Sequence, residues 1–228
     1  MIKMLRSLLF DGCYYTWTFF LAVCGLPVLF LPRIFAVRLS RFWNYGNMWL
    51  MKHVLGLTYK IDGYLPKEPF ILASKHESAW ETLLFSVLLN DPAFVLKGSL
   101  LHVPLIGWYF RKTKMISVQR KGGKRNNNNF LALSRNAAQQ NRSIVIFPEG
   151  TRTNPGASST LKPGVWHLYK NLKMPVVTVA LNSGRYWSRR VFFKQPGEVS
   201  VVIRSVTIGP DETKESFLKK VEKGIYAL

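Results

Sequence analysis

The sequence is poor in cysteine and in acidic residues. Only two cysteines occur, Cys13 and Cys24, so neither a disulfide framework nor the Cys/His spacing of a zinc site is present. Against 32 lysines and arginines there are 12 aspartates and glutamates, and the formal net charge is +20. A field of this sign attracts polyanions, namely nucleic acids, anionic membrane surfaces or phosphorylated substrates. Charge alone does not choose among these partners.

Apolar residues, in contrast, are plentiful. Hydrophobic residues make up 48% and aromatic residues 14% of the 228 positions, which excludes a disordered chain. This length suffices for one sizeable core, and no internal repeat divides the chain. The expected organisation is therefore one catalytic domain with a short appendage.

The longest uncharged stretch, residues 12–32, lies near the N-terminus. About 20 apolar residues suffice to span a bilayer as a helix. A cleaved signal peptide is not expected, because the apolar sequence continues past the nearest small-residue exit site through Leu31. Two alternatives stay open, a spanning helix and a re-entrant anchor broken at Gly25 and Pro27. Basic residues flank both ends, so they do not orient the stretch.

The next segment, residues 35–55, mixes arginines and a lysine with several aromatic residues. This composition is typical of an interfacial helix. The alternative is a helix packed on the core, with its aromatic residues inside and its arginines solvated. One helix can satisfy both descriptions.

Beyond residue 56, short β-rich runs alternate with helical stretches. The pattern predicts strands over residues 57–62, 70–74, 93–97, 115–118, 143–147, 176–181 and 198–206. It predicts helices over residues 80–89, 124–140, 164–171 and 212–225. This alternation is typical of an α/β domain with a mostly parallel central sheet flanked by helices. In such sheets, reactive groups gather in the loops beyond the carboxyl ends of the strands.

A histidine and a glutamate follow the second predicted strand, five residues apart. On one regular helix, His76 and Glu81 would point about 140° apart. They meet only if His76 lies on the loop before the helix and Glu81 lies in its first turns. The carboxylate then takes the proton of one imidazole nitrogen and leaves the other free to accept a proton from a hydroxyl. The alternative is a polar loop histidine and a solvated acid at a helix start.

A second candidate site follows the strand predicted at residues 143–147, where the sequence continues PEGTR. Glycine permits a close backbone approach, threonine supplies a hydroxyl, and arginine offers a fork suited to phosphate. Such a segment alone is a turn with a surface arginine. Its place at the end of a strand makes it a candidate binding loop.

Together the two segments resemble the 1-acylglycerol-3-phosphate acyltransferases, a family of glycerolipid acyltransferases. That family carries a His-x4-Asp motif and, later, a Phe-Pro-Glu-Gly-Thr-Arg motif. Residues 147–152 match the second motif in full, and His76 matches the first, with Glu81 in place of Asp. The resemblance covers roughly residues 57–185.

Two further blocks of the family are matched less closely. The first runs from Lys97 to Arg120, with Gly98 and Gln119 where the family has acidic residues. The other is an apolar strand in which Thr178 replaces a proline.

The resemblance implies acyl transfer from acyl-CoA or acyl carrier protein to the sn-2 hydroxyl of 1-acylglycerol-3-phosphate, giving phosphatidic acid. His76 would be the general base, oriented by Glu81. A substrate-binding set is also implied: Lys97, Arg120, Glu149, Gly150, Thr151 and Arg152. Its two arginines would hold the acceptor's phosphate, and its glutamate and threonine would position the glycerol. No metal or bound cofactor is implied.

The apolar N-terminal stretch and the resemblance together set the expected surroundings. Residues 1–55 are predicted to form membrane-anchoring and interfacial helices, and residues 56–228 the acyltransferase domain. Expected partners are a phospholipid membrane, a lysophospholipid acceptor and a thioester donor, with no nucleic acid. The expected location is the cytoplasmic face of the inner or cell membrane. Two alternatives stay open: another acceptor, such as a lyso-aminolipid or glycerol-3-phosphate, and a non-catalytic basic membrane-binding protein.

Overall fold

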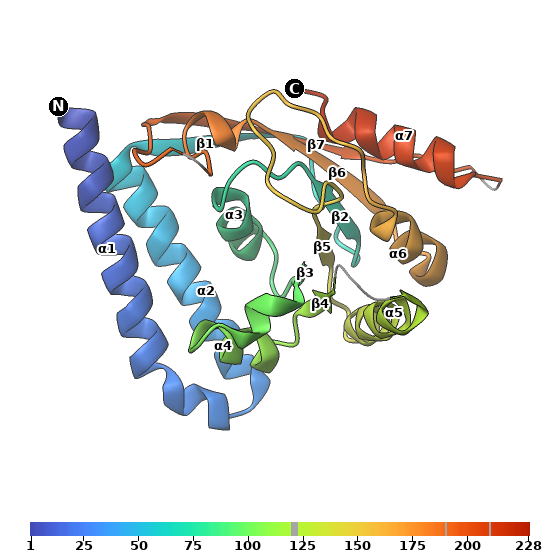
Figure 1. The fold of residues 1–228 in the computed structure, drawn as a ribbon, viewed down its shortest axis with the longest axis horizontal. Helices are drawn as coiled ribbons and strands as arrows, with labels where there is room; N and C mark the ends of the chain where they lie inside the picture. The colour runs from blue at the N-terminus through green and yellow to red at the C-terminus, as the bar shows by residue number, and fades with distance from the viewer. Residues whose placement is uncertain (120–122, 190, 210) are drawn as a thin grey trace.

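The computed structural model describes residues 1–119, 123–189, 191–209 and 211–228. Seven strands of this described part form one sheet in the order β1-β7-β6-β2-β5-β3-β4 (Figure 1). The strands are β1 (Leu57–Asp62), β2 (Ile71–Ser74), β3 (Ala93–Lys97), β4 (Ile116–Val118), β5 (Ile144–Ile146), β6 (Val176–Leu181) and β7 (Gly197–Ser205). Neighbouring strands are parallel except β6 and β7, which are antiparallel. The predicted mostly parallel α/β sheet is confirmed, and each predicted strand agrees to within one residue at its ends.

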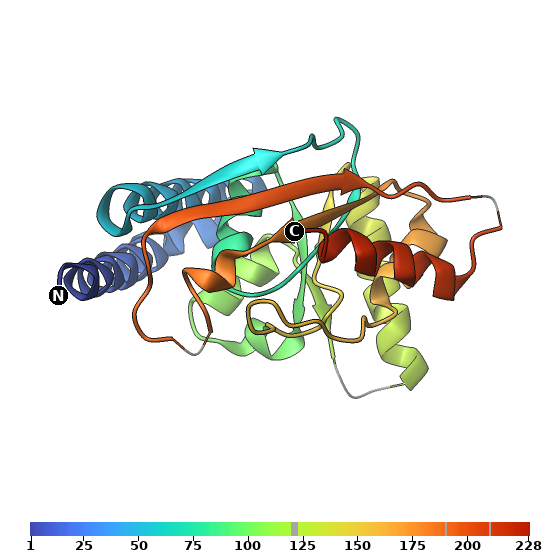
Figure 2. The same ribbon diagram turned by 90° about the horizontal axis from the view of Figure 1, so that it is seen from above.

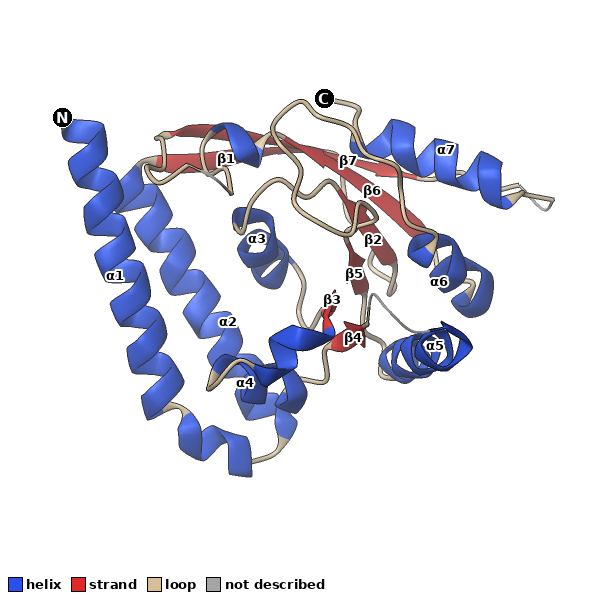
Figure 3. Cartoon of the chain, viewed as in Figure 1, coloured by secondary structure: helices blue, strands red, loops and turns tan. Residues whose placement is uncertain are grey.

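The helices are α1 (Ile2–Cys24), α2 (Arg33–Leu50), α3 (Trp80–Leu88), α4 (Ile106–Lys112), α5 (Gly123–Gln139), α6 (Gly164–Leu172) and α7 (Lys214–Ile225) (Figure 3). The four helices predicted after residue 56 are all present. Helix α4 was not predicted, because its second residue is a glycine, which has a low helix propensity. That residue, Gly107, lies so close to the Leu101 carbonyl that a Cβ would stand 2.4 Å from the oxygen.

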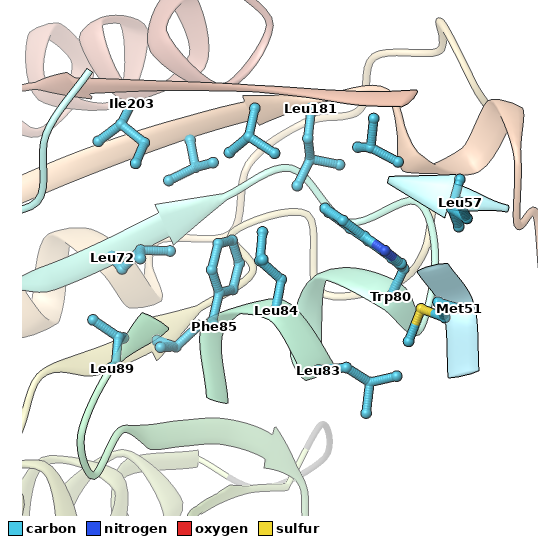
Figure 4. Packing of buried hydrophobic residues seen from close by; sticks show 14 of the residues in the cluster. Met51, Leu57, Leu72, Trp80, Leu83, Leu84, Phe85, Leu89, Leu181 and Ile203 are labelled. Atoms are coloured by element: carbon cyan, nitrogen blue, oxygen red, sulfur yellow. The ribbon is translucent and has the colours of Figure 1, made fainter. Parts of the chain in front are cut away.

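Helices cover both faces of the sheet (Figures 1 and 2). Alternate residues of β2 point to opposite sides, so Leu72 packs toward α3 and Ile71 packs toward α5, α6 and α7. Both residues are fully buried. Burial on both faces is the usual state of parallel strands and explains their unbroken apolar sequence. Figure 4 shows Trp80, at the start of α3, filling the space between this helix and the strands above it.

The N-terminal helices α1 and α2 form a hairpin (Figure 1). The chain leaves α1 at Gly25 and passes through a 3₁₀ turn, η1 (Leu26–Phe30), that contains Pro27. A Cβ at Gly25 would lie 2.4 Å from the side chain of Leu39 on α2, so the bend needs glycine. The break therefore falls at the two residues that the sequence indicated. Within the described residues, no helix has both the length and the apolar character required to cross a membrane.

The hairpin is built into the core of the domain. Phe10 of α1 and Met51 and Leu55 of the π-helical turn η2 (Met51–Leu55) are fully buried in the same cluster as Leu72. At the other end of the hairpin, the guanidinium of Arg33 holds both carboxylate oxygens of the aspartate before β3, at 2.7 and 2.6 Å. Core packing therefore crosses the boundary expected at residue 55.

Helix α2 departs in part from the arrangement expected of a helix packed on a core. Its aromatic residues Phe42, Tyr45 and Trp49 are exposed, whereas Asn44 and Asn47 are buried. The helix therefore fits both descriptions in part, because Trp43 packs against the core whereas these three rings face outward. Helix α2 packs against α3, and the side-chain amide of Asn44 donates to the carbonyl of Ser40 within the helix at 2.7 Å.

Candidate active site

The candidate site lies at the carboxyl edge of four adjacent parallel strands, β6, β2, β5 and β3. The loop after β2 carries His76, and the loops on either side carry Ser183 and Phe147. Lys97 ends β3 at the same edge and is exposed. This edge is where ligands bind in open α/β sheets.

The central pair joins His76 to Glu81. The Nδ1 atom of His76 lies 2.8 Å from Oε1 of Glu81, and because the partner is a carboxylate, Nδ1 carries the proton and donates it. His76 lies on the loop and Glu81 in the first turn of α3, the arrangement that the spacing required. Within the described part of the chain, Nε2 of His76 makes no hydrogen bond. It is therefore free to accept a proton from a bound hydroxyl.

The carboxylate of Glu81 is fully buried and is fixed by three further donors. Oε1 accepts the backbone N–H groups of Glu77 and Ser78 at 2.8 and 2.7 Å. Oε2 accepts the hydroxyl of Ser183, in the segment after β6, at 2.8 Å. The longer side chain of glutamate thus reaches back over the loop that precedes its own helix. A carboxylate held in this way fixes the orientation of the imidazole and stabilises its protonated form.

The ring of His76 is also fixed from one face. It stacks on Phe147 with the ring centres 3.9 Å apart and the planes 19° from parallel. Phe147 directly follows β5 and precedes the PEGTR loop. The sequence predicted a motif that includes this residue but assigned it no role. The stacking ties the two motifs together at His76.

Glu149 is buried beneath the same loop. Its Oε2 accepts the backbone N–H of His76 at 2.7 Å. Its Oε1 accepts the hydroxyls of Thr153 at 3.1 Å and Tyr226 at 2.8 Å. Burial raises the pKa of Glu149, and these hydrogen bonds, led by the one from the His76 amide, act against that rise. Each of these bonds is to the protein, so the carboxylate supports the His76 loop from behind.

A buried ion pair closes the loop on its other side. Nζ of Lys75 lies 2.7 Å from Oε1 of Glu77, and both side chains are almost fully buried. Oε2 of Glu77 accepts the backbone N–H of Gly184 at 2.9 Å. A Cβ at Gly184 would stand 2.8 Å from the Cβ of Glu77, so the position needs glycine. The loop is therefore held to the segments after both β5 and β6.

Tyr226, near the end of the chain, is a member of the site that sequence reasoning missed. Its hydroxyl accepts the N–H of Ser159 at 2.9 Å and donates to Glu149. The ammonium of Lys75 lies 5.4 Å from the centre of its ring. Tyr226 belongs to no motif and is 77 residues from Glu149 in the sequence. No local signal could have found it.

Replacing Tyr226 by phenylalanine is expected to destabilise the protein by about 1–3 kcal/mol at pH 7, because a buried carboxylate loses a donor. The hydrogen bond favours the ionised form of Glu149 and lowers its pKa. Its contribution is therefore present above the pKa of Glu149 in the folded protein and is lost as the pH falls through that value. Thermal unfolding of both proteins at pH 7 and at about pH 4 measures this difference.

The control for this change is Tyr64→Phe, because the side chain of Tyr64 is 93% exposed. It should leave the melting temperature unchanged at both pH values. An equal loss of stability at the two pH values for Tyr226→Phe would contradict a bond to the ionised carboxylate.

The remaining predicted substrate-binding residues are only partly gathered. Gly150 and Thr151 are exposed on the loop after β5, and Gly150 has a φ of +70°, which glycine adopts without strain. Arg152 follows them, is half-buried, and faces a cavity of about 400 Å³. Arg120 lies outside the described residues. In the described part of the chain, no group of three or more His, Cys, Asp or Glu side chains could hold a metal ion.

This fold and this pair of motif loops define an acyltransferase-type site, and the chain belongs to the acyltransferase family, whose sequence profile matches residues 56–182. The resemblance stated from the motifs is thereby confirmed. Two similar proteins are named 1-acyl-sn-glycerol-3-phosphate acyltransferase. The one from Pseudomonas aeruginosa is 35% identical over 169 residues, covering 71% of this chain and 63% of that protein. The one from Saccharomyces cerevisiae is 28% identical over 139 residues, covering 59% and 46%.

The chain thus spans less than two thirds of the length of either relative. A solved structure covers it more completely. The crystal structure of the 1-acyl-sn-glycerophosphate (LPA) acyltransferase PlsC from Thermotoga maritima matches with a TM-score of 0.77 at 19% identity. The match covers 99% of this chain and 95% of that one. At this identity the likeness shows that the fold is shared.

Proposed function

We propose that the protein transfers an acyl group from a thioester donor, acyl-CoA or acyl carrier protein, to the sn-2 hydroxyl of 1-acylglycerol-3-phosphate, giving phosphatidic acid. One observation carries the proposal. His76 is held through Nδ1 by a buried carboxylate at 2.8 Å, with Nε2 free, beside a complete Phe-Pro-Glu-Gly-Thr-Arg loop. The names of the similar proteins support the acceptor and the product.

The chemistry needs one base that also serves as an acid. Nε2 of His76 takes the proton of the acceptor hydroxyl as its oxygen attacks the thioester carbonyl. The resulting imidazolium is stabilised by the carboxylate of Glu81. When the tetrahedral intermediate collapses, the carbon–sulfur bond breaks and Nε2 returns the proton to the leaving thiolate. An ester and a thiol are formed, and the base is regenerated.

The tetrahedral intermediate carries an oxyanion that needs donors placed in advance. The backbone N–H groups of Thr151 and Arg152 donate no hydrogen bond within the described part of the chain. They lie on the loop that stacks its first residue, Phe147, on the ring of His76. We assign the oxyanion to these two amides, with the guanidinium of Arg152 on the acceptor's phosphate.

The proposed place of action is a membrane surface, on the cytoplasmic face of the inner or cell membrane. The hairpin presents large apolar side chains to the outside: Leu5, Leu8, Leu9, Tyr15, Phe19, Phe20, Phe30, Phe42, Tyr45 and Trp49. Phe30, at the tip of the hairpin, is 91% exposed. Many exposed apolar side chains on a chain with a net charge of +20 suit an anionic leaflet.

The test is acyl transfer from labelled acyl-CoA to 1-acylglycerol-3-phosphate in anionic vesicles, with phosphatidic acid as the measured product. Parallel assays use acyl carrier protein as donor and glycerol-3-phosphate or a lyso-aminolipid as acceptor. Product from the first acceptor at the highest kcat/KM supports the proposal. A higher kcat/KM with another acceptor would show that this other compound is the substrate. If the protein binds vesicles but forms no product from any pair of donor and acceptor, it is a basic membrane-binding protein and not an enzyme of this class.

A further inference from the structure

The cavity that Arg152 faces lies beside the proposed base. It has a volume of about 400 Å³ and Ala79, three residues after His76, forms part of its wall. Arg152 directly precedes Thr153, whose backbone N–H donates to the carbonyl of His76 at 2.8 Å. A group bound in this cavity therefore meets two segments that are tied to His76. Ala79 lies three residues after it, and Arg152 lies next to the residue that hydrogen-bonds to its carbonyl.

Another part of the wall comes from the segment after β6, which lies beyond the part of the chain that the family profile matches. It includes Trp187 and Arg189. This segment is fixed to the site, because Ser183 donates to the carboxylate of Glu81 and the N–H of Trp187 donates to the carbonyl of Ser183 at 2.9 Å. Arg189 thus extends from a wall anchored to the catalytic pair.

Helix α1 supplies the third wall through Leu8, Asp11 and Tyr15. The ring of Phe10 meets the edge of Trp187 at 5.6 Å, which joins the helix to the segment after β6. The backbone N–H of Lys194 donates to the hydroxyl of Ser7 at 2.8 Å. The hairpin is therefore part of the cavity as well as an apolar surface.

The charges in the cavity do not cancel. Lys194 is paired with Asp11, the one acidic residue of the wall. Arg152 and Arg189 form no ion pair within the described part of the chain. Two guanidinium groups from different loops face one cavity without a carboxylate of their own. A phosphomonoester, which carries up to two negative charges and accepts bidentate hydrogen bonds, complements them.

The rim of the cavity is apolar. Val191 and Phe192 on one side and Leu8 and Tyr15 on the other are all exposed, and Phe192 is 71% exposed. A ligand with a phosphate at one end and an acyl chain at the other complements both the arginines of the cavity and its apolar rim. The phosphate lies between the arginines, and the chain crosses the rim toward the apolar face of α1.

We infer that Arg189 is a further ligand of the acceptor's phosphate, in the same cavity as Arg152, and that it determines the preference for a phosphomonoester head group. The acceptor lies between α1 and the segment after β6, with its free hydroxyl toward His76. The inference rests on the proposed function for the identity of the acceptor. The cavity and its unpaired arginines are independent of that proposal.

The test compares Arg189→Gln with the matched control Arg185→Gln, which removes the same charge from an exposed arginine outside the cavity. Arg189→Gln is expected to raise the KM for 1-acylglycerol-3-phosphate at least about tenfold, because a hydrogen bond between charged groups is lost. The KM for acyl-CoA should not change. The preference over lysophosphatidylcholine should fall by a similar factor, and the control should resemble wild type.

Three outcomes overturn the inference: no change in the acceptor KM, an equal change in the control, or a rise confined to the KM for acyl-CoA. The last would place the donor's phosphates in the cavity. Calorimetric binding of 1-acylglycerol-3-phosphate, dispersed in a neutral detergent, separates this question from activity. If wild type has no acyltransferase activity but binds this lipid at least about tenfold more tightly than Arg189→Gln, the proposed function fails and the site stands. Equal binding by both proteins would show that Arg189 is not a ligand of this lipid.

Discussion

Replacing His76 by alanine is expected to lower kcat for acyl transfer by about 10²–10⁴-fold, the usual contribution of a positioned general base. The acceptor hydroxyl then has no group to take its proton, and the thiolate has none to return it. Binding should persist, because the proposed phosphate ligands belong to other loops. The KM for the acceptor should therefore change little, and the loss should appear in kcat.

The structure offers controls for this change. The loop should survive, since the hydrogen bond from residue 76 to Glu149 uses the backbone N–H, which alanine retains. A single cooperative unfolding transition a few degrees below that of wild type would show this, because buried Glu81 loses one of its four donors but keeps the other three. His167→Ala, on α6, which covers the sheet face opposite to α3, removes a histidine from outside the site and should leave kcat unchanged. A His76→Ala protein as active as wild type would show that the base is another group.

The strands and the histidine–glutamate pair were predictable because their signals are local. Strands such as Val176–Leu181 are buried on both faces of the sheet, and so their sequence is apolar except for Thr178, whose hydroxyl donates to the carbonyl of Arg204. The pairing of His76 with Glu81 follows from their spacing at the end of a strand, because a regular helix would keep them apart. Each inference required only a few consecutive residues.

The contacts that hold the loops of the site in place were not predictable, because they join residues far apart in the sequence. Ser183 reaches Glu81 across 102 residues and Tyr226 reaches Glu149 across 77. Neither contact leaves a periodicity or a spacing in the sequence, since each depends on which strands become neighbours. The order β6-β2-β5 brings these segments together, and that order is a property of the assembled sheet.

The orientation of α2 shows a different limit to what the sequence predicts about which helix face is buried. The rule that aromatic residues face the core applies to a helix with one apolar neighbour and water on its other side. Here Asn44 and Asn47 face inward, and Phe42, Tyr45 and Trp49 face outward. If the outer face meets lipid, as proposed, both faces of the helix favour apolar residues and the rule no longer chooses between them.

Replacing Glu81 by glutamine separates the charge of the carboxylate from its geometry. Glutamine can keep its oxygen where Oε1 accepts from His76 and from the backbone of Glu77 and Ser78. Its amide group then faces the hydroxyl of Ser183, which can accept a hydrogen bond. The fold should therefore be retained. The imidazolium formed during the reaction loses its counter-charge, and kcat is expected to fall by about 10²–10³-fold.

Glu81→Asp makes the complementary change, because it keeps the charge and shortens the reach by one methylene. Aspartate cannot hold the ring, both amides and the hydroxyl of Ser183 without a shift of the loop. Because the counter-charge remains, kcat should fall only about tenfold, less than for glutamine. Glu222→Gln, which removes an exposed charge on α7, should be neutral. If aspartate proves more damaging than glutamine, the position of the imidazole matters more than the charge beside it. Glu81 would then be a structural support of the loop, and the imidazolium would need another source of stabilisation.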